Sequence, residues 1–244
     1  MKTHPLLSRL STGAAALALL AVPSLAHADT APEPGASTVS ATVGQPASAS
    51  APAGSWLAET PTTIDETALA ELEIAEPGAG SDYDRDAFGT AWADVDENGC
   101  GTRDDILARD MTEETFGGEE ECEVRTGTLE DPYSGETIDF DKSEGSYQID
   151  IDHLIPLGAA WEAGADEWTD EERLAYANDP AVLLAVNAGD NRSKSDATIW
   201  EWMPDNEAIS CQYGAQRVEI SVEYELSVSE EDHQVLSDLA EECA

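Results

Sequence analysis

The sequence predicts an α+β domain in which a small sheet is surrounded by helices. Segments with apolar residues at helical spacing are separated by short runs that are alternating or continuously apolar, which are typical of strands. Residues 62–244 carry nearly all of these segments, contain no internal repeat and have a length that suits one domain. We therefore expect one mostly helical domain with a small sheet.

The first 28 residues have the features of a secretory signal peptide. A basic start (Lys2, Arg9) precedes an almost wholly apolar stretch at 12–22, and Ala-His-Ala at 26–28 offers a cleavage site. The apolar stretch is too short to span a bilayer, which argues against a retained anchor. We therefore expect a secreted mature chain without stable membrane association.

A linker and a short helix are expected next. Residues 29–61 are rich in Ala, Pro, Ser, Gly and Thr and bury too little apolar surface to fold, so a disordered linker is expected. Thr63 with Glu66 three residues later resembles a capping box, and apolar residues at Leu69 and Leu72 follow. The domain is therefore expected to span 62–244.

The other elements are assigned from their periodicity and flanking turn residues. Helices are expected at 102–111, 157–177, 190–202 and 229–242, strands at 147–151 and 182–186, a hairpin at 127–140, and either state at 217–226.

The chain is extremely acidic, with 52 Asp and Glu against 11 Lys and Arg and a net charge of −41. Removal of the first 28 residues, which carry two of the basic residues, moves the net charge to −43. Such a chain repels nucleic acid at low ionic strength, whereas salt screens the repulsion. Two interpretations stay open: adaptation to a saline habitat, or acidic residues gathered in disordered tails.

The four cysteines are expected to form two disulfides, because their number is even and the chain is predicted to be exported. Of the three possible connectivities, proximity favours Cys100–Cys122 and Cys211–Cys243. A four-thiolate zinc site is the alternative, but the sequence has no C-x-x-C pair.

The strongest candidate for chemistry is the pair Asp152-His153 at the end of a predicted strand. A neutral imidazole is the usual base for activating water near neutral pH, and a carboxylate binds a hard divalent cation. Most Asp-His pairs in proteins are structural, so a catalytic role requires further functional residues near this pair. Such residues follow the next strand, where Asn191, Arg192 and Lys194 open a helix and combine a neutral oxygen ligand with local positive charge.

At Asp152-His153 and Asn191-x-x-Lys194 the chain resembles the signature of the HNH nucleases, and the nuclease domain of RNA-guided CRISPR effectors carries a similar second half of this signature. The wider pattern is similar to secreted actinobacterial HNH proteins related to the C-terminal domain of GmrSD restriction enzymes. The motifs that carry this wider resemblance are Tyr83-Asp84-Arg85, Phe88-Gly89, Trp92, the run 94–100, Thr102-Arg103, Ile106-Leu107, Asp110, the run 131–135, Asn178-Asp179-Pro180 and the run 183–186.

The resemblance implies a ββα-metal (HNH) core within the mostly helical domain, and a metal-dependent endonuclease acting on nucleic acid, expected as a monomer. Asp152 and Asn191 would hold one Mg²⁺-like ion, for which Mn²⁺ or Ca²⁺ are alternatives, and His153 would be the general base. Lys194 would lie near the phosphate. The family's middle Asn falls at Val182 here, a departure that puts the orientation of His153 in doubt.

Basic side chains near the predicted site are expected to offset substrate charge. These are Arg192, Lys194 and Arg103. A non-catalytic extracellular binding module on the same scaffold is the second hypothesis, and it is motivated by Val182 and the negative charge. A serine hydrolase is disfavoured, because no G-x-S-x-G motif occurs. Whether the substrate is DNA or RNA stays open.

A second candidate site is a calcium loop. Asp94, Asp96, Asn98 and Asp105 fit positions 1, 3, 5 and 12 of such a loop, with Gly99 at position 6. The alternative is a disulfide-pinned turn whose Asp residues cap the next helix. Five tryptophans at helical spacings are expected in the core rather than as base-stacking platforms: Trp92, Trp161, Trp168, Trp200 and Trp202.

Overall fold

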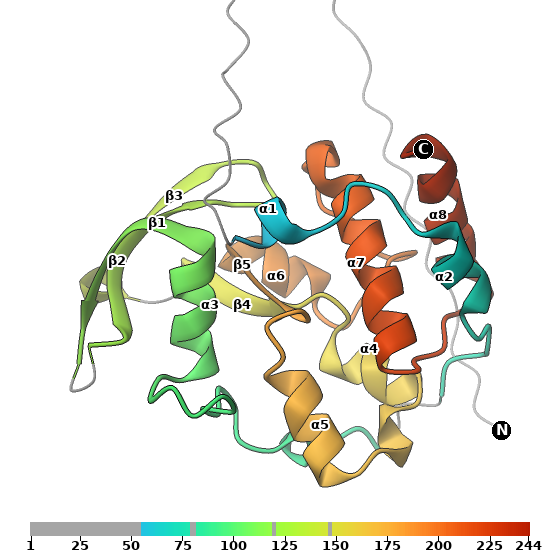
Figure 1. Cartoon of the computed structure of the whole chain (residues 1–244), viewed down its shortest axis with the longest axis horizontal. Coiled ribbons are helices and arrows are strands. Elements are labelled where there is room, and N and C mark those ends of the chain that lie inside the picture. Colours follow the sequence, from blue (N-terminus) through green and yellow to red (C-terminus); the bar gives the residue numbers. More distant parts are fainter. Residues whose placement is uncertain (1–54, 79–81, 119–120, 146–147) are drawn as a thin grey trace, which may run out of the picture. The chain divides into compact units, whose positions relative to one another are not determined.

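The computed structural model describes residues 55–78, 82–118, 121–145 and 148–244 (Figure 1). The predicted signal peptide and residues 29–54 of the predicted linker lie outside these residues. Residues 55–61, which the sequence placed in the linker, belong to the fold. Trp56 in helix α1 (Trp56–Glu59) is buried, and its backbone N–H donates to Asp110 at 3.1 Å. The buried Trp56 side chain thus holds residues 55–61 against the domain, although their composition is typical of a disordered linker.

A three-stranded antiparallel sheet forms one side of the domain made by these described residues. Its order is β1 (Met111–Gly117), β2 (Glu123–Glu130) and β3 (Thr137–Asp141), and helix α3 (Thr102–Asp110) packs against it (Figure 1). The predicted hairpin and helix are confirmed. Strand β1 was not predicted; it follows α3 without a linker, and its register with β2 shifts on both sides of Thr115.

Strands β4 (Ile149–His153) and β5 (Leu183–Asn187) form a separate antiparallel pair, in which His153 lies opposite Leu183. Helix α6 (Ala188–Lys194) follows β5 directly and contacts both strands. The expected strand–strand–helix order is therefore present. The helix begins after the Asn187 cap, two residues earlier than predicted. It is nevertheless shorter than the predicted 190–202, because it ends before Ser195, whose φ is 51°.

The predicted helix at 157–177 is wrong as a single element. It is divided into α4 (Leu157–Glu162), η3 (Ala165–Glu167) and α5 (Asp170–Ala177). Gly164 has a φ of 131°, which interrupts the helix, and Thr169 forms a capping box with Glu172 that starts α5. Apolar spacing continued across the break and concealed it.

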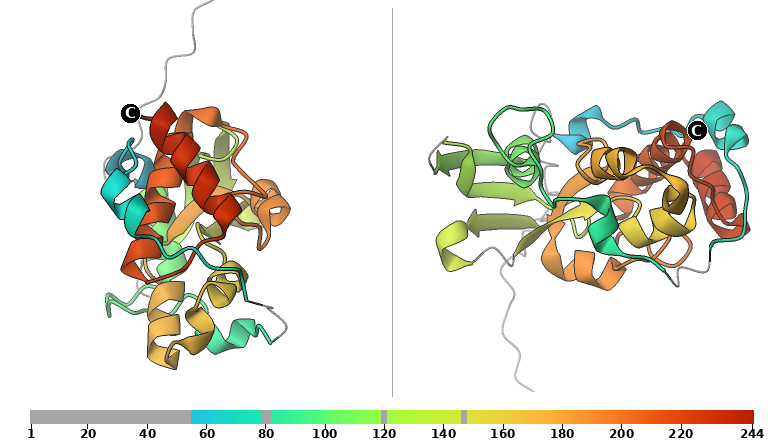
Figure 2. Two further views of the ribbon diagram at one scale, coloured as in Figure 1. Left: turned by 90° about the vertical axis from the view of Figure 1, so that its right-hand side faces the viewer. Right: turned by 90° about the horizontal axis from the view of Figure 1, so that it is seen from below.

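Helices cover the other side of the unit (Figure 2). Helix α7 (Ser210–Glu223) settles the open assignment at 217–226 as helix for most of its length, and α8 (Glu230–Glu242) is confirmed. Both pack on α2 (Glu66–Glu71), whose cap is Asp65 rather than Thr63. The remaining short helices are η1 (Arg85–Phe88), η2 (Lys142–Glu144) and η4 (Glu207–Ile209). No helix among the described residues is long and apolar enough to cross a membrane.

Both predicted disulfides are present. Cys100–Cys122 ties the segment before α3 to the start of β2, with Cα atoms 5.7 Å apart. Cys211–Cys243 joins the beginning of α7 to the end of α8, with Cα atoms 5.8 Å apart. The bonds therefore fasten the sheet to α3 and close the C-terminal helical pair.

Candidate active site

His153 ends β4 and is held from three sides. Its Nε2 lies 3.0 Å from the Ala177 carbonyl oxygen, and its ring is nearly parallel to those of Trp92 and Tyr176. A carbonyl oxygen only accepts, so Nε2 carries the hydrogen and Nδ1 keeps a free lone pair. Burial lowers the pKa of His153 to about 4, so the imidazole is neutral at neutral pH.

The Val182 departure has a structural counterpart. Val182 is fully buried, and its carbonyl accepts from the backbone N–H of Leu154 at 2.9 Å. This bond continues the β4–β5 pairing beyond His153. The Ala177 carbonyl thus holds the imidazole, and the bond at Val182 holds the backbone that carries it, without an Asn side chain at residue 182.

Asp152 and Lys194 form a buried ion pair. The Lys194 Nζ lies 2.9 Å and 2.8 Å from the two carboxylate oxygens of Asp152 and donates to the His153 carbonyl at 2.8 Å. The Tyr133 hydroxyl donates to Oδ2 of Asp152 at 2.5 Å. The Lys194 side chain is 0% exposed. The prediction that Lys194 contacts the phosphate is therefore wrong for this structure, because its ammonium lies behind Asp152.

A polar cleft of about 320 Å³ opens in front of Asp152 and His153. Asn191 and Arg192 of α6 line it, and the Arg192 side chain is 65% exposed. Arg85 of η1 also lines the cleft and was not among the predicted site residues. Its place among only nine basic residues after the predicted signal peptide was the signal that could have singled it out.

Arg103 does not line the cleft. Its guanidinium donates to the Ile149 carbonyl at 2.9 Å, so it fixes the start of β4. The prediction that Arg103 binds substrate is corrected, because its guanidinium is hydrogen-bonded to the backbone of the strand that carries the site.

Residues 101–239 match the family model described as the C-terminal domain of GmrSD restriction endonucleases. The chain belongs to this family. Asp152, His153 and Asn191 lie within the matched residues, whereas Arg85 and Trp92 precede them. The family description is that of a nuclease domain.

A secreted relative extends the similarity beyond this domain. The "uncharacterized secreted protein" of Arthroderma benhamiae is 30% identical over 180 residues, which are 73% of this chain and 84% of the relative. The relative is fungal, so the actinobacterial affiliation stays a prediction. No solved structure matches the chain.

The resemblance implies a divalent cation at this site, and the donors present fit a hard one. Lys194 and Tyr133 use three of the four lone pairs of the Asp152 carboxylate, which leaves one on Oδ1. Asn191 lines the same cleft, and its side chain has no hydrogen bond to another described residue. Mg²⁺ retains waters and needs only one or two protein carboxylates besides phosphate oxygens. Asp152 and Asn191 meet that requirement.

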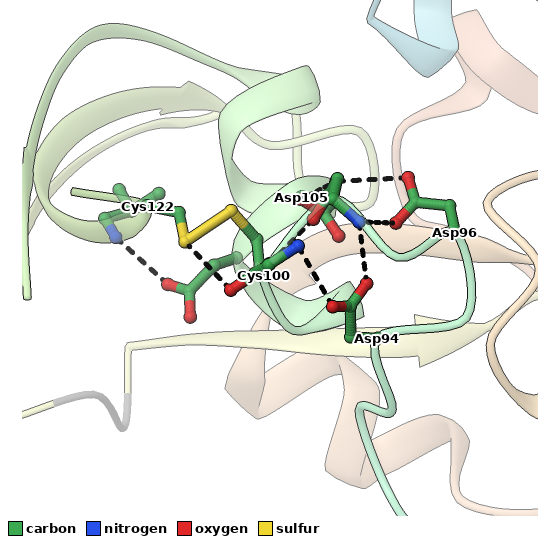
Figure 3. The surroundings of a disulfide bond; sticks show 9 residues. Asp94, Asp96, Cys100, Asp105 and Cys122 are labelled. Atoms are coloured by element: carbon green, nitrogen blue, oxygen red, sulfur yellow. Dashed lines mark hydrogen bonds between the residues drawn. A yellow bond between two sulfur atoms is a disulfide. The ribbon is translucent and has the colours of Figure 1, made fainter. Parts of the chain in front are cut away.

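The predicted calcium loop has another arrangement (Figure 3). Asp94 accepts from the backbone N–H groups of Asn98 and Gly99, and the Asn98 amide donates to Asp96 and Asp105. No group of three or more His, Cys, Asp or Glu among the described residues has metal-binding geometry. The calcium site stays a prediction: in this structure Asp94, Asp96 and Asp105 accept hydrogen bonds within a turn next to the Cys100–Cys122 disulfide. They do not cap α3, which begins after Gly101 without a side-chain cap.

Proposed function

We propose that this protein is a secreted, metal-dependent endonuclease that hydrolyses phosphodiester bonds of nucleic acid, with His153 as the general base. The observation that carries the proposal is the state of His153. Its imidazole is neutral, its Nε2–H is bound to the Ala177 carbonyl, and it borders a polar cleft that two arginines also line. Membership in a nuclease family supports the same reaction.

In the proposed reaction, Nδ1 of His153 takes a proton from a water molecule, whose oxygen attacks the phosphorus as the bond to the leaving oxygen breaks. The phosphate favours the imidazolium that forms, because an anion nearby stabilises the charged ring. Arg85 and Arg192 bind the phosphate oxygens. A divalent cation held by Asp152 and Asn191 would stabilise the charge on the leaving oxygen.

Lys194 and Tyr133 act by positioning. The ammonium binds both the Asp152 carboxylate and the His153 carbonyl, so one side chain fixes two consecutive residues of the site. Because these groups are buried, their geometry is set before substrate arrives.

Two observations support secretion. The fungal relative is named a secreted protein, and the four cysteines form two disulfides, which persist in oxidising compartments.

The proposal is tested by cleavage of plasmid DNA, single-stranded DNA and RNA with purified residues 29–244. Mg²⁺ and excess chelator are compared from low salt to molar NaCl. We expect Mg²⁺-dependent cleavage that increases with salt, and loss of cleavage in His153→Ala. The control is His233→Ala, because His233 lies on α8 outside the cleft. Cleavage that survives the chelator contradicts the metal assignment, and unchanged cleavage by His153→Ala contradicts the base.

A non-catalytic binding module remains the second candidate, and the Asp152–Lys194 pair favours it. An ammonium on both carboxylate oxygens weakens the attraction of Asp152 for a cation. Calorimetry that shows Mg²⁺ or Ca²⁺ binding, with no turnover of DNA or RNA at any salt concentration, would support this candidate over the enzyme.

A further inference from the structure

A second pocket adjoins the polar cleft and differs from it in chemistry. It measures about 150 Å³ and shares Arg85, His153 and Leu157 with the cleft. Its other lining residues include Trp92, which is partly buried, and Phe88, which is 2% exposed. We call it the Trp92 pocket. The two spaces meet at the proposed general base, so one substrate can extend from one into the other.

The backbone around Trp92 is built to hold that residue in place. Trp92 has a φ of 57°, a left-handed conformation that is costly for a bulky side chain. The next residue, Ala93, is fixed at both backbone groups: its N–H donates to Asn178 at 3.0 Å, and its carbonyl accepts from Thr102 at 2.5 Å. A left-handed conformation maintained in this way is typical of functional sites.

The Trp92 ring faces the site rather than only the core. It is only partly buried, and its centroid lies 6.3 Å from that of His153, at an interplanar angle of 20°. Trp200, by contrast, is 62% exposed and lines neither space. The expectation that the tryptophans belong to the core is therefore not met by Trp200, whereas Trp92 packs against the core cluster around Ile106 and also lines the pocket.

A nucleotide matches the two spaces in order, because it joins an anionic phosphate to a flat aromatic base. The cleft offers Arg85 and Arg192 to the phosphate, and the pocket offers aromatic walls to the base. Asp86 also lines the pocket, and its negative charge disfavours a second phosphate there.

We infer that the Trp92 pocket is a nucleobase subsite, in which the base next to the scissile phosphate packs against Trp92 while Arg85 binds that phosphate. This inference rests on the proposed function. A base inside a duplex is covered on both faces by its neighbours, so only an unpaired or flipped base can enter. The preferred substrate is therefore single-stranded nucleic acid.

The test compares kcat/KM of wild-type protein, Trp92→Ala and Trp92→Phe on a fluorescent single-stranded oligonucleotide with one cleavage site. Trp92→Ala is expected to lower kcat/KM by about 5- to 150-fold, the range for loss of one base–aromatic stack. Trp92→Phe should retain most activity because it keeps an aromatic face. Trp200→Ala is the matched control and should equal wild type. Equal kcat/KM for wild type and Trp92→Ala would overturn the inference.

A modified substrate gives a test that does not depend on how a variant folds. Wild-type protein is assayed on the same oligonucleotide with an abasic residue placed in turn on each side of the cleaved bond. One abasic position should reproduce the loss seen in Trp92→Ala, and on that substrate wild type and Trp92→Ala should be equal. Abasic oligonucleotides cleaved as fast as the intact one at both positions would contradict the base subsite.

Binding separates failure of the subsite from failure of the proposed function. Fluorescence anisotropy with His153→Ala measures oligonucleotide affinity without turnover. Base-dependent binding that weakens in His153→Ala/Trp92→Ala, together with no cleavage by wild type, would retain the subsite and overturn the endonuclease. Cleavage by wild type that depends neither on Trp92 nor on the base would retain the endonuclease and overturn the subsite.

Discussion

The Lys194 ammonium lies 2.8 Å from Oδ2 of Asp152 in a place where neither side chain is appreciably exposed. These residues are 42 positions apart, so their contact joins α6 to β4. Burial lowers the pKa of Lys194 and the positive charge of Arg217 lowers it further, whereas the Asp152 carboxylate opposes both effects. The pair is stable only as a pair, since each charge has lost its water.

Replacement of Lys194 by Met should therefore destabilise the fold by about 3–5 kcal/mol, because it leaves the Asp152 carboxylate buried without a counter-charge. Urea unfolding monitored by circular dichroism measures the change. Arg192→Met on the same helix is the control and should alter the free energy of unfolding by less than about 0.5 kcal/mol, since its side chain is exposed. The double variant Asp152→Asn/Lys194→Met should recover part of the lost free energy of unfolding, because it leaves no unpaired buried charge. A Lys194→Met protein as stable as wild type would show that the pair is not buried in solution.

Arg85 gives a prediction about substrate binding rather than stability. Arg85→Ala should weaken oligonucleotide binding and reduce the slope of log affinity against log salt by about one, the value for one lost phosphate contact. Arg125→Ala is a suitable control, because Arg125 pairs with Glu123 on the three-stranded sheet, outside the cleft. Anisotropy at several NaCl concentrations measures both slopes. An unchanged slope for Arg85→Ala would remove Arg85 from the phosphate site.

The sequence predicted the part of the site that is local in the chain. Asp152 and His153 are consecutive at the end of a recognisable strand, and Asn191 lies in the helix that follows the next strand of the pair. Their proximity follows from a simple strand–strand–helix order. Arg85 precedes His153 by 68 positions and reaches the cleft through η1, so no spacing rule could place it.

Burial was the second property that the sequence could not provide. Lys194 and Arg192 are both basic and two residues apart, yet one side chain is 0% exposed and the other 65%. Which side of α6 faces β4 depends on tertiary packing. The same is true of Trp56, whose burial brings α1 into the fold despite its surroundings.

Removal of the Cys211–Cys243 disulfide should lower the free energy of unfolding by about 4 kcal/mol, on the loop-entropy model for a sequence separation of 32. The change is best made as Cys211→Ser/Cys243→Ser, because a single substitution leaves a reactive thiol. Thermal unfolding with and without reductant provides the measurement. Reductant should lower the midpoint of wild type, and it should affect the double variant only through Cys100–Cys122. Equal stability of the double variant and wild type would contradict the prediction.

Two buried tyrosines predict the response of the fold to alkali. Tyr176 and Tyr213 are fully buried, and burial raises the pKa of both, that of Tyr213 to about 12. In the unfolded chain a tyrosine ionises near pH 10. A raised folded pKa means that this stabilisation is fully present below pH 10 and declines as pH rises from about 10 towards 12. Phenolate absorbance of the buried tyrosines should therefore appear together with loss of the circular dichroism signal.

Tyr213→Phe removes one such group and should make the decline in stability shallower. Complete phenolate formation at pH 12 with native circular dichroism would show that these rings are accessible to solvent.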